Sequence, residues 1–224
     1  MMKALQACSA LLGLLCASGV AGQEPPRKPQ VTIEKEGNII NIIGVGAGSW
    51  RAVITSVQKL REVPRESDSS VVATLAANVD ALPPPYLYEL VRRICISDPE
   101  RASYLFGLAG LRARYDAYKC VDETAKAGVH ATVFSLQIPE CKSMLSDTDL
   151  FLSSMRKLRD AKELFSSKAS PWWICSHGMA AIKAGLEKRT LDVAEWLKPE
   201  SEWEKIKEQV RSDIDYTIEK NSKK

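Results

Sequence analysis

Four cysteines in the body of the chain restrict its fold more than any other feature of the sequence. The chain has six cysteines, and two of them lie within an apolar N-terminal stretch that has the pattern of a secretory signal. An even number of cysteines in an exported protein favours disulfides over metal ligation or thiol catalysis. We therefore expect two disulfides among the remaining four, which are Cys95, Cys120, Cys141 and Cys175.

The secretory signal is expected to comprise residues 1–22. A positive charge precedes its apolar stretch, and the small residues Ala21 and Gly22 end it. Cys16 follows the bulky Leu15, whereas lipoprotein processing needs a small residue before the cysteine, so we do not expect a lipoprotein. No later segment stays apolar for the ~18 residues that a membrane span requires. The sequence thus predicts export, to a bacterial periplasm, without a transmembrane segment.

The expected helices also indicate which cysteines pair. If the helices expected at 98–119 and 122–136 form an antiparallel hairpin, the end of the second returns to the start of the first and brings Cys141 beside Cys95. A bond from Cys95 to Cys120 would instead span about 33 Å of helix, whereas a disulfide allows only ~6 Å between Cα atoms. We therefore predict the disulfides Cys95–Cys141 and Cys120–Cys175.

The segment before the helices is expected to hold a linker and a β-hairpin. Residues 23–30 contain three prolines, which fix φ and remove backbone donors, so they predict a linker. Residues 31–48 contain two β-branched runs around a hairpin-type turn and end in a glycine-rich connection, Gly44–Gly48. This connection lacks the glycine and lysine spacing of nucleotide-binding loops, so we expect a permissive backbone rather than a phosphate site.

The remainder, residues 49–224, is expected to form one helical domain. Its apolar residues recur at three- and four-residue steps, and Ser97 and Glu100 have the spacing of a capping box. The sequence predicts a mostly α, compact multi-helix domain with a short N-terminal β-hairpin, stabilised by disulfides. Besides the two helices that frame Cys120, helices are expected near 50–63, 68–82, 85–95, 147–165, 174–187 and 201–220.

The run Pro171–Met179 holds the densest group of unusual residues. Cys175 and His177 suggest a thiol nucleophile and its base, with His130 as another candidate base. However, residues two apart point to different sides of a helix or strand, and a catalytic cysteine would have to escape disulfide pairing. We therefore expect an aromatic corner pinned by a disulfide, in which His177 is hydrogen-bonded and remains only a weak catalytic candidate.

Carboxylates are the second route to catalysis, because cleavage of cell-wall glycans needs an acid and a base. The candidates are Asp116 and Glu123 in the central helices and Asp147 and Asp149 at a helix start. Each has a structural explanation as well: we expect Asp116 to pair with Arg112 one turn away, and the other three to favour helix N-termini. The sequence contains no group that predicts a perturbed carboxylate.

Charge and histidine content exclude several functions. Lysine and arginine number 31 against 28 aspartate and glutamate residues, and a net charge of +3 is too small to predict nucleic-acid binding. Basic runs such as Arg92-Arg93 and Arg112–Arg114 are expected on solvated faces. With only two histidines and no Cys-x-x-Cys pair, the chain predicts no metal site and no cofactor.

The predicted function is that of an exported cell-envelope binding protein that acts on another protein of the envelope. By analogy with small exported, disulfide-bonded helical domains, it would serve as a periplasmic inhibitor or immunity-type protein. The alternatives are an envelope hydrolase acting on peptidoglycan or peptide, and a periplasmic protein that binds a small ligand between helices. The sequence predicts neither the partner's identity nor the oligomeric state.

Overall fold

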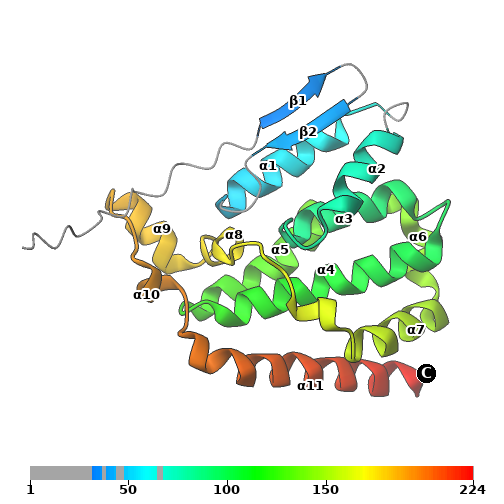
Figure 1. Cartoon of the computed structure of the whole chain (residues 1–224). Coiled ribbons are helices and arrows are strands. Elements are labelled where there is room, and N and C mark those ends of the chain that lie inside the picture. Colours follow the sequence, from blue (N-terminus) through cyan, green and yellow to red (C-terminus); the bar gives the residue numbers. More distant parts are fainter. Residues whose placement is uncertain (1–31, 37–38, 44–47, 65–67, 224) are drawn as a thin grey trace, which may run out of the picture.

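A computed structural model describes residues 32–36, 39–43, 48–64 and 68–223 (Figure 1). The predicted signal peptide, the proline-rich linker and most of the glycine-rich connection lie outside these residues. Strands β1 (Thr32–Glu36) and β2 (Ile39–Ile43) pair antiparallel, with Thr32 opposite Ile43. The turn between them is also outside the described residues, so the N-terminal hairpin stays a prediction.

The described part of the chain is mainly helical, which confirms the prediction of a mostly α, multi-helix fold. A long helix, α4, crosses the molecule, and α11 runs along its lower side in Figure 1. Short 3₁₀ turns lie at Glu123–Lys126 (η2), Pro139–Cys141 (η3), Lys162–Phe165 (η4) and Glu200–Glu202 (η5). The α-helices are α1 (Trp50–Arg61), α2 (Asp68–Ala77), α3 (Pro84–Ile94), α4 (Pro99–Lys119), α5 (Ala127–Ser135), α6 (Lys142–Ser146), α7 (Thr148–Arg159), α8 (Trp172–Cys175), α9 (Met179–Leu186), α10 (Val193–Trp196) and α11 (Trp203–Ser222).

The core is built around α4, against which α3, α7 and α11 all pack. Buried alanines along α4 leave room for these neighbours, and Gly107 does so most directly. A Cβ atom on Gly107 would lie 2.7 Å from Cδ1 of Leu158, so a larger residue there would force the Leu158 side chain of α7 to shift. The terminal helix α11 adds three residues at the expected helical spacing, Ile206, Val210 and Ile214.

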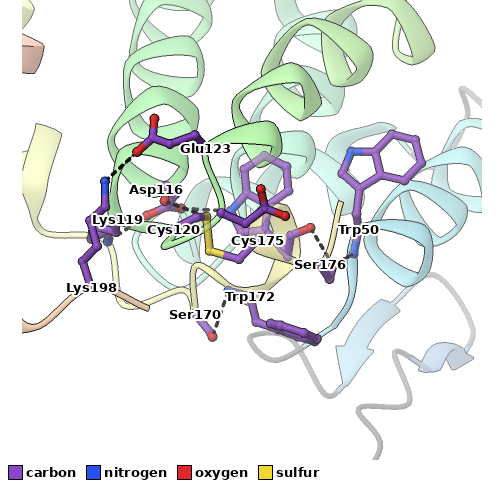
Figure 2. Close-up of a disulfide and its surroundings, with 12 residues drawn as sticks. Trp50, Asp116, Lys119, Cys120, Glu123, Ser170, Trp172, Cys175, Ser176 and Lys198 are labelled. Carbon is purple, nitrogen blue, oxygen red and sulfur yellow. Dashed lines mark hydrogen bonds and ion pairs between the residues drawn. A yellow bond between two sulfur atoms is a disulfide. The ribbon is translucent and has the colours of Figure 1, made fainter. Parts of the chain in front are cut away.

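The two disulfides join Cys95 to Cys141 and Cys120 to Cys175, with Cα atoms 5.6 and 5.4 Å apart. This is the connectivity that the sequence predicts. Cys95 directly follows α3 and Cys120 directly follows α4, so the two bonds fasten opposite ends of the central helix. The second bond is drawn in Figure 2, where it links the end of α4 to α8.

The arginines of α3 and α4 correct two predictions. The Arg93 side chain is buried and bonds Glu89, Asp68 and the carbonyl of Leu60, so this basic run is not a solvated face. Arg112 is equally buried and does not pair with the aspartate one turn away. It donates instead to carboxylate and carbonyl oxygens far along the chain, those of Val79, Asp80 and Glu163.

Several helices begin or end at other residues than the sequence predicts. Asp98, not Ser97, caps α4, because its side chain accepts a hydrogen bond from the Arg101 amide. The helix predicted to reach residue 82 ends at Ala77. The helix predicted over 147–165 ends at Arg159, and that over 174–187 is divided into α8 and α9. Apolar periodicity continues across these breaks, so it could not reveal them.

Candidate functional site

Asp116, the first carboxylate candidate, is buried beside the Cys120–Cys175 disulfide (Figure 2). Its carboxylate accepts a hydrogen bond from Nε1 of Trp173 at 2.9 Å and forms an ion pair with Nζ of Lys119 at 2.9 Å. The same ammonium lies 4.2 Å from the ring centre of Tyr115. Asp116 therefore links Lys119 of α4 to Trp173 of α8 in a buried network. Its carboxylate is engaged in these contacts and is not free to act as an acid or base.

Cys175 and His177 face different partners, as their spacing predicts. The Cys175 sulfur is consumed in the disulfide, while the His177 ring packs edge-on against Trp50 of α1 with ring centres 4.9 Å apart. The prediction of a hydrogen-bonded histidine is not met at Nδ1, which is buried without a partner among the residues described. Burial lowers the pKa of His177. Figure 2 shows how Ser176 completes this corner by accepting a hydrogen bond from the Trp50 backbone amide.

Two of the other carboxylate candidates, Glu123 and Asp147, also have structural partners. Glu123 is exposed and pairs with Lys126 and Lys198, and hydrogen bonds from these two lysines lower the pKa of its carboxyl. Asp147 caps α7 by accepting a hydrogen bond from the Leu150 amide. Within the described ranges, Asp116, Glu123 and His177 make no direct contact with one another. Nor do those ranges contain a cluster of three metal-ligating side chains.

A concave surface lies elsewhere, along the face of α4 that looks toward α5, α6 and α7. Two adjoining cavities of about 350 and 230 Å³ share Tyr88, Phe106 and Val133 in their walls. The larger extends to Leu136 and Leu145, and the smaller extends to α7 and α11. We name the two cavities together the α4 cleft. Its lining is predominantly apolar, as is usual where proteins bind small molecules.

Gly110 explains why the smaller cavity is open. This glycine lies in the middle of α4, and a Cβ atom placed on it would meet only the Tyr88 hydroxyl, at 3.5 Å. An ordinary side chain at this position would project toward Tyr88 of α3, which lines the same cavity. Apolar side chains remain exposed at the edge of the larger cavity, namely Val133 and Leu145, and beside them Phe134 is 76% exposed.

Arg114 is the charged group in the wall of the smaller cavity, and the expectation of a solvated face for its basic run is not met there. It is half-buried, one turn beyond Gly110, and it makes no hydrogen bond or ion pair with any residue in the described part of the chain. The Tyr88 side chain is only 2% exposed, and its hydroxyl likewise has no hydrogen-bond partner there. Burial raises the pKa of Tyr88, so the hydroxyl keeps its proton. His130 and Thr217 stand at the edge of the same cavity.

Comparison with known proteins found no family model, no curated protein and no solved structure that is significantly similar to the chain. Across the described segments, every helix is too short or too polar to cross a membrane.

Proposed function

We propose that this chain is a non-catalytic, exported binding protein of the cell envelope that takes up a small ligand in the α4 cleft. The observation that carries the proposal is the cleft itself, whose larger cavity of about 350 Å³ falls within the range of small-molecule sites. Its apolar walls and few polar groups match the usual composition of such sites. Export rests on the signal pattern of residues 1–22 and agrees with the presence of two disulfides.

The hydrolase alternative has weaker support. Catalytic carboxylates need an environment that sets their pKa values apart, and they must lie on opposite sides of a substrate. Asp116 is enclosed by Lys119 and Trp173, and Glu123 is neutralised by surface lysines. Neither carboxylate lines the α4 cleft. A binding role does not require either group to be available.

A protein partner, as for an inhibitor or immunity-type protein, is the second candidate function. It is favoured by the exposed apolar face of α9, where Met179, Ile182 and Leu186 follow one another at steps of three and four residues. Leu186 is 81% exposed. A photo-crosslinking side chain at position 186, with exposed Lys59 as the control position, tests this candidate. One discrete adduct at 186 alone would support it, and its absence would contradict it.

The small-ligand proposal is tested with a neutral fluorescent probe, N-phenyl-1-naphthylamine. The variant Gly110→Leu fills the smaller cavity, and Gly185→Leu is the matched control because a Cβ atom on Gly185 meets nothing within 4 Å. We expect saturable fluorescence enhancement with the wild type and the control, and at least about tenfold weaker binding by Gly110→Leu. No saturable binding by the wild type, or equal binding by a folded Gly110→Leu variant, would overturn the proposal. Circular dichroism establishes that each variant is folded.

A further inference from the structure

The arginines on α3 and α4 differ in one respect that bears on the ligand. Arg101 is exposed, and among the arginines that are at least partly buried, Arg92, Arg93 and Arg112 each contact at least one carboxylate. Arg114 has no such contact in the described residues, although it is half-buried at the wall of the cleft. A cation that has lost part of its hydration is unfavourable unless an anion replaces that hydration. The cleft therefore lacks a negative charge at this end.

One acidic group, Asp213, adjoins Arg114 without contacting it directly in the described residues. Asp213 of α11 lines a neighbouring hollow together with Arg114, but its carboxylate accepts hydrogen bonds from the Tyr118 hydroxyl at 2.7 Å and from Gln209 at 3.0 Å. Among the described residues Asp213 forms no ion pair with Arg114. The guanidinium group therefore keeps hydrogen-bond donors that an anion in the cleft can use.

A second donor lies at the same end. The Tyr88 hydroxyl faces the backbone of Gly110, and Arg114 lies one helical turn farther along α4. Both residues line the smaller cavity. An arginine fork and one hydroxyl match the two oxygens and single charge of a carboxylate. A phosphate dianion would require further donors.

The opposite end of the cleft is mainly apolar. The larger cavity continues past Phe106 to Leu136, Ile138 and Leu145. The hydrocarbon chain of a ligand whose polar end lies at Arg114 would therefore run along these side chains. Lys142 stands at this far end, but it is exposed and hydrated, and such a cation attracts an anion only weakly.

We propose that the cleft binds an amphipathic monocarboxylate, a free fatty acid or a molecule of similar form, with its carboxylate on Arg114 and Tyr88 and its apolar chain toward Leu145. This inference rests on the proposed function, because it assigns a ligand class to the same cleft. It also gives the cleft a direction: the Arg114 end binds the carboxylate of the ligand, and the Leu145 end binds its hydrocarbon chain.

The test compares dodecanoate with 1-dodecanol, which has the same chain and no charge, by displacement of the neutral probe below the micelle concentration. A charged hydrogen bond contributes roughly 1.5–3 kcal/mol, so we expect the wild type to prefer dodecanoate by about tenfold or more. Arg114→Gln should lose this preference and keep its affinity for dodecanol. Arg114→Lys should keep part of the preference. The control Arg156→Gln, at an exposed position on α7, should behave like the wild type.

Three results would overturn the inference. Equal affinity of the wild type for the two ligands, or an unchanged preference in Arg114→Gln, would remove the carboxylate subsite and leave the cleft as an apolar binding site. Binding to phosphatidylglycerol vesicles without binding of monomeric dodecanoate would assign the surface to a membrane instead. Failure of the proposed function looks different, because then neither ligand displaces the probe and Gly110→Leu changes nothing.

Discussion

Replacing Cys120 and Cys175 together by alanine is expected to lower the free energy of unfolding by about 4 kcal/mol. The two residues are 55 positions apart, and the entropy of closing a loop of that length in the unfolded chain gives this value at 25 °C. Folded domains are stable by about 5–15 kcal/mol, so the loss would be a large part of the total. Replacing Cys95 and Cys141, which are 46 positions apart, should cost nearly the same.

Urea unfolding followed by circular dichroism measures both losses. Each double variant should also show a steeper dependence on urea, because its unfolded chain is less constrained and exposes more surface. The matched control is the wild type with both bonds reduced, which should be less stable than either double variant. A loss below about 1.5 kcal/mol for the Cys120 and Cys175 pair would refute loop closure as the main contribution of the bond.

Three further outcomes are expected. In thermal unfolding, Gly110→Ala should stabilise the protein by about 0.5–1 kcal/mol through helix propensity, whereas Gly107→Ala should destabilise it, because its Cβ would meet Leu158. Asp116→Ala should lower the free energy of unfolding in urea by about 3–5 kcal/mol, because it leaves the buried Lys119 ammonium and the Trp173 indole N–H without a partner. A decrease below about 1 kcal/mol would show that the network does not stabilise the fold. Burial lowers the pKa of His177 in the folded state below 6.5, so the unfolded state binds the extra proton and stability falls as the pH drops below 6.5. This part of the pH dependence should vanish in His177→Phe, and its persistence there would assign it to another group.

Features that depend on local spacing could be predicted from the sequence. The buried stripe of α11 follows from residues three and four apart, and the start of α4 follows from Pro99. The cysteine pairing could be predicted because the length of a helix restricts which cysteines can meet. These arguments need only helix geometry, which does not depend on the rest of the fold.

Features that depend on long-range packing could not be predicted. Arg112 has a carboxylate one turn away, yet it bonds Asp80 and the Glu163 carbonyl, because the approach of two distant segments decides its partners. The α4 cleft has no local signal either, since it forms from a missing side chain at Gly110 and walls on several separate helices. Arg114 looked like one member of a basic run, and only the packing around it shows that it lacks an acidic partner.

The position of α4 between two cysteines also bears on how the protein matures. Along the described chain the first cysteine bonds the third and the second bonds the fourth, so pairing in sequence order would join Cys95 wrongly to Cys120. An intact α4 of 21 residues holds these two thiols about 32 Å apart. Helices form within microseconds, whereas disulfides form in seconds or longer. An α4 that forms before oxidation would therefore keep Cys95 and Cys120 too far apart to bond each other.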